Sequence, residues 1–276
     1  MAWYKNRKGE QLWYEDEGTG CPVVLLHGWC MSSVVWKYQY DAATSLFHDS
    51  LRLLAPDLRG HGRSREISGG LSFESCANDL VDLFNCLDLS NAVMICWSMG
   101  AQIALQSYAE LSGKLAGMVL VSATPCFTSS SDFPHGIAES EASGMRLKVQ
   151  RSVRRAIDGF FSRMFAATEL ENHHLLSEIT QLLESVSPPD TTIVLDALDA
   201  LVHTDMRKLL NTVTIPTLIV NGSEDRICLP KASSYIKTHI PGAEQVVFPN
   251  CGHAPFLTYS HQFNTELLRF IRSVSG

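Results

Sequence analysis

The sequence predicts an α/β fold with a mostly parallel central sheet, helices on both faces and an inserted helical cap. In the first half of the 276-residue chain, apolar runs of strand length alternate with amphipathic runs of helix length, and the alternation returns near the end. This alternation is typical of parallel strands joined by crossover helices. Residues 127–208 show helical patterns without a convincing strand and are too long for a loop. We therefore predict a core formed by 1–126 and 209–276, with 127–208 as the cap.

The individual elements follow from local patterns. Short, continuous apolar runs are typical of strands buried on both faces. After an N-terminal hairpin at 3–4 and 11–15, such strands are predicted at 23–26, 51–55, 93–95, 115–121, 217–220 and 245–248. Helices are predicted at 35–46, 72–87, 101–109, 231–238 and 262–274. Ser72 is the expected N-cap of its helix, and Pro216 precedes a strand, where its missing N–H is tolerated.

The composition is that of an ordinary globular protein, with 45% apolar and 18% charged residues. No apolar run has the length of a membrane span, and residues 1–17 lack the hydrophobic core of a secretion signal. We therefore expect a cytoplasmic protein, and we expect a monomer. The formal net charge of −7 argues against general nucleic-acid binding, which requires a positive surface.

The eight cysteines show none of the close spacings that bind metals. Several lie in apolar segments, where a free thiol behaves as a small hydrophobic side chain. We expect reduced core thiols, no metal and no organic cofactor.

A nucleophile is predicted where the strand at 93–95 meets the helix at 101–109. Residues 96–100, Cys-Trp-Ser-Met-Gly, join the two without a loop. In this context the G-x-S-x-G pattern indicates a nucleophile elbow, a sharp turn that exposes the serine hydroxyl at the edge of the sheet. Cys96 stands where glycine is usual and is small enough to keep the turn. We predict that Ser98 is the nucleophile; a buried structural serine is the alternative.

A serine hydroxyl needs a base, and the base needs an acid that orients it. In the chain order serine, acid, histidine, the histidine follows the last strand, as His253 does. The acid follows the preceding strand, where Asp225 comes three residues after Gly222. Glu224 is the rival for the acid, and an ordinary loop histidine is the alternative for His253.

Attack on a carbonyl also requires hydrogen-bond donors for the oxyanion. The backbone N–H of Met99, just after the nucleophile, is one candidate, and that of Trp29, after the first long parallel strand, is the other. His27 is expected to shape this turn without taking protons. The glycines of the turn at 56–64 suggest a phosphate-binding loop, but the lysine of that motif is missing. We predict a structural role for the turn.

Several motifs together resemble the α/β-hydrolase fold over essentially the whole chain. They are His27-Gly28-Trp29, Asp57-x-x-Gly60-x-Gly62-x-Ser64, the Ser98 elbow, Gly222-x-x-Asp225 and Gly252-His253-x-Pro255. More narrowly, residues 97–100, 125–127 and 253–256 resemble the BioH family, the pimeloyl-[acyl-carrier protein] methyl ester esterases of biotin synthesis. That family usually has Gly-Trp-Ser-Leu-Gly at the elbow, from which Cys96 and Met99 depart.

The resemblance implies a serine esterase whose acyl pocket is lined by the stretch 160–164. Plain packing of the cap on the core is the alternative for this stretch. The substrate contacts that the resemblance implies are Trp29, Ser98, Met99, Phe160, Phe161, Ser162, Arg163, Met164 and His253.

Residues 145–165 carry six basic residues and one acidic residue. As a single helix, the segment would place an apolar stripe on one side and basic residues on the other. The basic face would consist of Lys148, Arg151, Arg154 and Arg155. A basic face on an acidic protein attracts an acidic partner, and the resemblance implies a cap that binds acyl carrier protein. We expect carrier docking here, because solvated faces normally mix charges and this one lacks acidic residues; a solvated or membrane-surface face is the alternative. The next segment, 169–183, is acidic and has no arginine, so the docking surface would rest mainly on this basic helix.

These observations lead to one expected activity and two alternatives. We expect a serine carboxylesterase that hydrolyses the methyl ester of a pimeloyl chain bound to acyl carrier protein. A broader carboxylesterase, a lactonase or a C–C hydrolase would use the same residues. A ligand receptor on a hydrolase scaffold is the alternative from a different class. Serine at position 98 disfavours haloalkane dehalogenase and epoxide hydrolase chemistry, for which the resemblance would imply aspartate.

Overall fold

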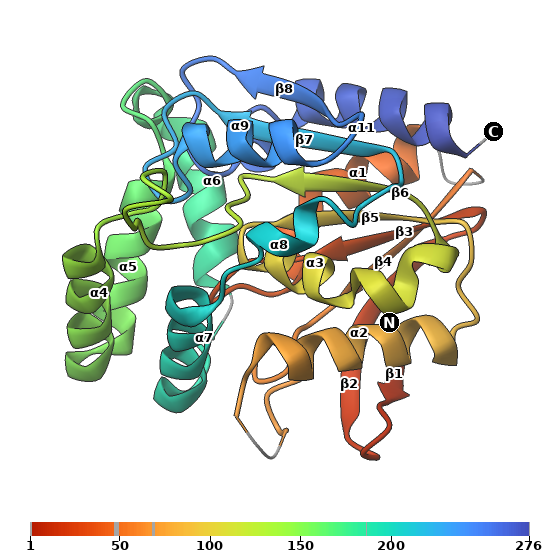
Figure 1. Ribbon diagram of the computed structural model, residues 1–276, viewed down its shortest axis with the longest axis horizontal. Helices are drawn as coiled ribbons and strands as arrows, with labels where there is room; N and C mark the ends of the chain where they lie inside the picture. Colours follow the sequence, from red (N-terminus) through yellow and green to blue (C-terminus); the bar gives the residue numbers. More distant parts are fainter. Residues whose placement is uncertain (1, 47–49, 68–69, 186, 276) are drawn as a thin grey trace.

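The computed structural model describes residues 2–46, 50–67, 70–185 and 187–275. In this part of the chain, an eight-stranded sheet has the order β1-β2-β4-β3-β5-β6-β7-β8. The first two strands pair antiparallel, β2 pairs antiparallel with β4, and all further pairs are parallel (Figure 1). The strands are β1 (Ala2–Lys5), β2 (Gln11–Gly18), β3 (Cys21–Leu26), β4 (Leu51–Pro56), β5 (Ala92–Trp97), β6 (Leu115–Val121), β7 (Thr217–Gly222) and β8 (Glu244–Phe248).

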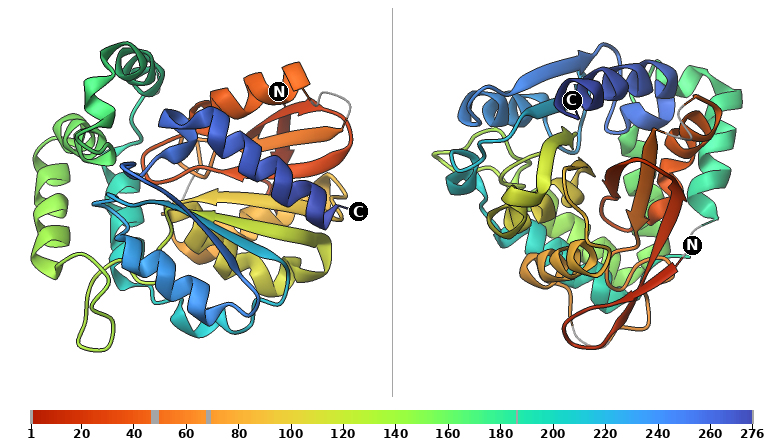
Figure 2. Two further views of the ribbon diagram at one scale, coloured as in Figure 1. Left: turned by 90° about the horizontal axis from the view of Figure 1, so that it is seen from above. Right: turned by 90° about the vertical axis from the view of Figure 1, so that its right-hand side faces the viewer.

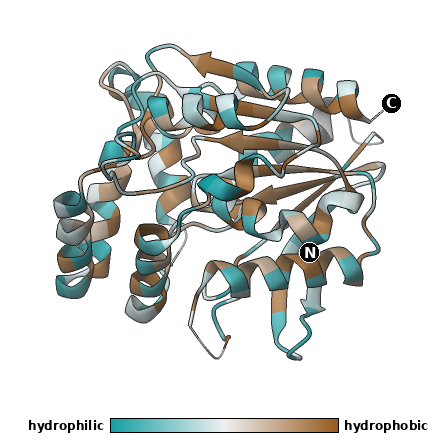
Figure 3. Cartoon of the chain, viewed as in Figure 1, coloured by the Kyte–Doolittle hydropathy of each residue, from teal (hydrophilic) through white to brown (hydrophobic). Residues whose placement is uncertain are grey.

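The predicted parallel core is confirmed, and two of its strands are buried throughout. Every residue of β5 and β7 is buried, as expected for apolar strands covered on both faces. Figure 3 shows that the strands are largely hydrophobic and that the surrounding helices carry both hydrophobic and hydrophilic residues. The second strand of the hairpin is longer than predicted because residues 14–18 also pair with β4.

Helices cover both faces of the sheet (Figure 2). On one face α1 (Lys37–Leu46) contacts α11 (Ser260–Val274), and on the other α2 (Phe73–Cys86) packs against α3 (Met99–Leu111). Helix α9 (Pro230–His239) packs on β7, and the short α10 (Pro255–Thr258) precedes α11. Short 3-10 helices are η1 (Ser33–Trp36) and η2 (Ser112–Lys114). Ser72 caps α2 as predicted, accepting a hydrogen bond from the Ser75 N–H.

Between β6 and β7 the described residues form helices and no strand. They are α4 (Glu139–Arg151), α5 (Val153–Met164), η3 (Glu169–Glu171), α6 (His173–Glu184), α7 (Thr191–His203) and α8 (Arg207–Leu210). The larger ones gather at the carboxyl ends of the parallel strands (Figure 1). The predicted cap boundaries, 127 and 208, stay a prediction, and the second falls within α8.

The prediction of one helix over 145–165 is wrong. The chain breaks at Ser152, whose backbone is extended and whose hydroxyl accepts a hydrogen bond from the Arg155 N–H. Serine favours such N-cap positions because its side chain competes with the helix for backbone donors. Residues before and after Ser152 therefore lie on two different helices and do not form the single basic face that was predicted.

None of the helices in the described ranges combines the length and the apolar character needed to cross a membrane.

Candidate active site

Ser98 lies at a sharp turn between β5 and α3. Its backbone has φ 54° and ψ −117°, a strained conformation for a residue other than glycine. The Ser98 N–H donates to the Val121 carbonyl at 2.9 Å, which ties the turn to the neighbouring strand. A Cβ atom on Gly100 would lie 2.8 Å from the carbonyl oxygens of both Leu26 and His27, so only glycine permits this close approach of helix and strand. The strained turn leaves the largely buried Ser98 side chain at the carboxyl edge of the sheet.

Cys96, at the first position of the elbow, is fully buried. Burial raises the pKa of its thiol well above the ordinary value, because a charged thiolate would lose its solvation. The thiol is therefore neutral and serves as a small packing group.

Asp225 and His253 form a buried pair. The His253 Nδ1 atom lies 2.8 Å from Asp225 Oδ2, and both side chains are 0% exposed. The other carboxylate oxygen accepts hydrogen bonds from the N–H groups of Ile227 (2.8 Å) and Cys228 (3.0 Å). The structure thus brings Asp225, and not its rival Glu224, against His253.

The His253 ring is held from several sides. Its backbone N–H donates to the Met164 carbonyl at 2.6 Å, and its carbonyl accepts from Trp97 Nε1 at 2.9 Å. The rings of Trp97 and Phe160 lie with centroids 5.4 Å and 6.3 Å from the imidazole. Because Nδ1 faces Asp225, Nε2 is the atom available for proton transfer, and it is buried without a hydrogen-bond partner in the described part of the chain.

The Ser98 hydroxyl lies beside the Cys228 thiol. Burial raises the pKa of Cys228 well above its ordinary value, and the Ser98 hydroxyl opposes this weakly. No hydrogen bond joins Ser98 to His253 within the described residues. Such contacts are often loose without substrate and tighten in the reacting complex.

Both predicted oxyanion donors lie next to Ser98. Met99 is the first residue of α3, so its N–H has no acceptor within the helix. Trp29 follows Gly28, at which a Cβ atom would lie 3.2 Å from Ser98 Cβ. The Trp29 ring stacks edge-on against Phe160 and donates from Nε1 to the Val194 carbonyl at 3.2 Å.

His27 has the structural character that was expected. Its Nδ1 lies 2.9 Å from the Gly28 carbonyl, and its Nε2 accepts from the Leu58 N–H at 3.0 Å. Burial lowers the pKa of His27 to about 4, so the ring is neutral near pH 7. In the turn at 56–64, Asp57 accepts hydrogen bonds from the N–H groups of Ser33 and Arg63, so this carboxylate organises the turn.

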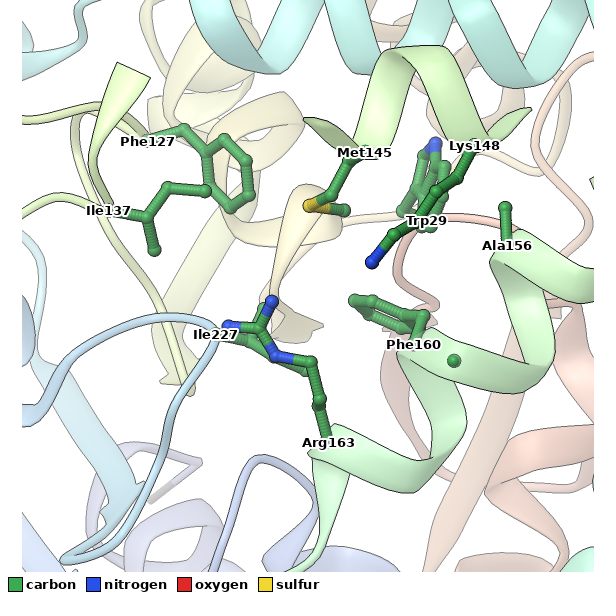
Figure 4. Close-up of a pocket in the computed structure, with 10 residues that line it drawn as sticks. Trp29, Phe127, Ile137, Met145, Lys148, Ala156, Phe160, Arg163 and Ile227 are labelled. Carbon is green, nitrogen blue, oxygen red and sulfur yellow. The ribbon is translucent and has the colours of Figure 1, made fainter. Parts of the chain in front are cut away.

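An apolar pocket lies between the core and the inserted helices (Figure 4). Its empty volume is about 470 Å³, counting space open to solvent, and its walls include Phe160 and Arg163 from the predicted acyl-binding stretch. The other members of the stretch lie elsewhere: Ser162 donates to the Gly159 carbonyl, and the buried Met164 supports His253 through its carbonyl. Phe161 lines a separate hollow beside Arg154. Wall residues that the sequence analysis did not single out are Phe127, Ile137, Met145, Ala156, Gly159 and Ile227.

The four predicted docking residues do not share one face. Lys148, on α4, lines the apolar pocket. Arg154, on α5, pairs with Asp158 at 3.0 Å and Glu184 at 3.3 Å. Arg151 and Arg155 are exposed. The break at Ser152 turns α4 and α5 differently, so the predicted face is divided.

Glu169 is a site residue that the sequence analysis missed. It is 8% exposed, and its Oε2 accepts hydrogen bonds from the N–H groups of Gly252 (2.8 Å) and Ala166 (2.6 Å). Its Oε1 accepts from the Thr258 hydroxyl. Glu169 thereby joins the segment after α5 to both sides of His253. It lies in an acidic segment without a motif, so no local signal marks it.

No group of His, Cys, Asp and Glu side chains within the described ranges is arranged to hold a metal ion. The eight cysteines are free thiols.

Comparison with known proteins places the chain in one fold family. Residues 22–259 match the model of the alpha/beta hydrolase fold family. The pimeloyl-[acyl-carrier protein] methyl ester esterase of Nitrosomonas europaea is 31% identical over 253 residues, which cover 90% of this chain and 95% of that protein. Among solved structures, an esterase from Exiguobacterium antarcticum has a TM-score of 0.89 at 25% identity, covering 98% of this chain and 99% of its own. A bromoperoxidase from Bacillus anthracis has a TM-score of 0.88, also at 25% identity, covering 98% of this chain and all of its own. The chain belongs to the α/β-hydrolase fold family, and within that family it is a carboxylic ester hydrolase.

Proposed function

We propose that this chain is a serine carboxylesterase that hydrolyses the methyl ester of a pimeloyl chain carried by acyl carrier protein. The observation that carries the esterase chemistry is the buried pair of Asp225 and His253, held at the same sheet edge as Ser98. The name of the Nitrosomonas relative supports the carrier-bound substrate. The step would serve biotin synthesis, as the motif resemblance suggests.

In the proposed mechanism, His253 Nε2 takes the Ser98 proton while the hydroxyl oxygen attacks the ester carbonyl. Asp225 holds the imidazole in the required tautomer and stabilises its protonated form. The N–H groups of Met99 and Trp29 stabilise the oxyanion. The tetrahedral intermediate expels methanol, which receives the proton from His253. A water molecule, deprotonated by His253, then releases the acid and restores Ser98.

Carrier docking would rest on a smaller set of cations than the sequence suggested. Arg151 and Arg155 are exposed, whereas Arg154 already pairs with two carboxylates. On a chain with a net charge of −7, Arg151 and Arg155 would supply the local positive charge for docking. Such a surface accelerates encounter with an acidic carrier and does so less at high salt.

The test of the reaction compares methanol release from pimeloyl-carrier methyl ester and from free short-chain methyl esters. We expect a higher kcat/KM for the carrier ester and loss of multiple turnover in Ser98→Ala. Equal kcat/KM values for the two substrates would instead favour the broader carboxylesterase. Turnover that stops after one equivalent for every ester would favour the receptor.

The test of docking uses the double variant Arg151→Glu/Arg155→Glu. We expect kcat/KM for the carrier ester to fall about tenfold at low salt, while a small aryl ester loses little. The matched control is Lys231→Glu/Lys237→Glu, which makes the same charge change on exposed residues of α9. Equal losses in both doubles would contradict docking at this surface.

A further inference from the structure

Two cationic side chains lie in the wall of an otherwise apolar pocket. Lys148 comes from α4 and Arg163 from α5, and the remaining wall residues are apolar or small. Figure 4 shows the side-chain nitrogen atoms of both residues directed into the space between the apolar walls. Both residues also reach solvent: Lys148 is exposed, and the Arg163 side chain is 39% exposed. Long cationic side chains usually extend away from apolar surfaces into water. A pair whose charged ends face apolar walls therefore suits an anionic ligand group that enters from solvent.

The two cations differ in how they are neutralised. Arg163 forms an ion pair with Glu141 and donates to the Arg226 carbonyl at 3.0 Å. Among the described residues, Lys148 has neither an ion pair nor a hydrogen bond to its side chain. Because Glu141 balances Arg163, Lys148 supplies the net positive charge of this end of the pocket.

Three wall residues of the pocket also contact the reacting groups or neighbour them in the chain. Phe160 lies against the His253 ring, and Ile227 donates its N–H to Asp225. Trp29 contributes to the same wall and carries a proposed oxyanion donor. A ligand in this pocket therefore lies against apolar walls that adjoin His253 and Asp225, within the same pocket that Lys148 and Arg163 line.

We propose that Lys148, assisted by Arg163, binds a terminal carboxylate, so that the enzyme also hydrolyses free half-esters of dicarboxylic acids. Such a molecule has an ester for Ser98 at one end, an apolar methylene chain for the pocket walls, and a carboxylate for the two cations at the other end. Water and the half-ester give the dicarboxylate and methanol, with Ser98 and His253 acting as on any ester. The proposal rests on the proposed esterase function, but it adds a charge preference that a plain acyl pocket would lack.

The experiment compares three methyl esters of equal chain length: a half-ester with a terminal carboxylate, a neutral ester with a terminal methyl group and an ester with a terminal ammonium. We expect the order carboxylate, neutral, ammonium in kcat/KM. In Lys148→Met the ratio of half-ester to neutral ester should fall about tenfold, mainly through KM, because a charge-assisted contact is lost. In Lys148→Glu, kcat/KM for the ammonium ester should exceed kcat/KM for the half-ester.

The control is Lys231→Met, which removes an exposed cation outside the pocket and should leave all three ratios unchanged. A wild-type enzyme indifferent to the terminal group, or ratios unchanged in Lys148→Met, would overturn the subsite while leaving the esterase function intact. If no ester is turned over, the proposed function fails, and the subsite is tested by titrating pimelate into Ser98→Ala with and without Lys148→Met. Equal affinities in that titration would overturn it as well.

Discussion

The two oxygen atoms of the Asp225 carboxylate have different partners. One faces His253 Nδ1, and the other accepts the N–H groups of Ile227 and Cys228. The two backbone N–H groups hold the carboxylate in place on its own loop. The carboxylate can therefore hold the imidazole ring in one orientation. At the scale of single residues, this buried arrangement makes Asp225 the positioning acid and leaves Glu224 outside.

Asp225→Asn is expected to lower kcat by about 10⁴-fold, because an amide can donate to His253 and stabilise the wrong tautomer. The measurement is the rate of methanol release under saturating substrate. Glu224→Gln is the matched change at the neighbouring position and should remain within about threefold of wild type. A larger loss in Glu224→Gln than in Asp225→Asn would reverse the assignment.

Two other buried histidines predict how stability depends on pH. Burial lowers the pKa of His27 to about 4 and that of His61 to about 3, and the rings lie 5.3 Å apart. Since both folded-state pKa values are below the unfolded value, the unfolded chain binds more protons in acid. The contribution of these two neutral histidines to the free energy of unfolding is therefore fully present above pH 6.5. It is lost as the pH falls toward 4.

The expected loss is about 3 kcal/mol of unfolding free energy for His27 alone between pH 7 and pH 4. Urea unfolding at pH 7.5, 5.5 and 4.5 measures it. His61→Gln should flatten the dependence, since it removes one of the two titrating groups. The same substitution at the exposed His261 should leave the dependence unchanged. Equal slopes in all three proteins would show that other groups govern acid unfolding.

At the scale of elements, the segment after α5 is part of the support for His253. The Met164 carbonyl accepts the His253 N–H, and Glu169 accepts the Gly252 N–H and the Thr258 hydroxyl. Asn250 adds a contact, because its carbonyl accepts the Thr168 hydroxyl at 3.1 Å. The inserted segment therefore contacts the histidine loop through backbone and side chain.

Glu169→Ala is expected to lower kcat about tenfold or more with a smaller change in KM, because a displaced imidazole impairs proton transfer more than binding. It should also cost about 1–3 kcal/mol in unfolding free energy, since buried N–H groups lose their acceptor. Glu171→Ala, an exposed change in the same 3-10 turn, is the control. Glu169→Gln keeps an acceptor oxygen and should restore part of kcat. A Glu169→Ala enzyme with wild-type kcat and lowered stability would restrict Glu169 to a structural role.

At the scale of the whole molecule, the charge distribution predicts a salt effect that depends on the substrate. The chain is acidic overall, with the exposed arginines Arg151 and Arg155 on the inserted helices. Raising the salt concentration screens the attraction of an acidic carrier over a distance of about 10 Å at 0.1 M. We expect kcat/KM to fall with salt for the carrier ester and to stay nearly constant for a neutral free ester, measured under identical conditions. Parallel salt curves would exclude electrostatic carrier recruitment.

Local sequence patterns predicted the features that depend on neighbouring residues. The apolar run before Ser98 and the helix after it are confirmed, as are the parallel strands that precede Asp225 and His253. The break at Ser152 was missed because the apolar periodicity continues through it. The pairing of β2 with β4 was missed because partners far apart in the sequence leave no local signal.

The sequence by itself determined the order of the strands along the chain and placed a serine, an acid and a histidine each after its own strand. That follows from the short-range preferences of backbone and side chains. Only the tertiary structure decided that Asp225 faces His253, that Glu169 supports the histidine loop and that Lys148 faces the pocket. These contacts join segments that are distant in the chain, and their partners are selected by packing and by the need to satisfy buried polar groups, which no local pattern encodes.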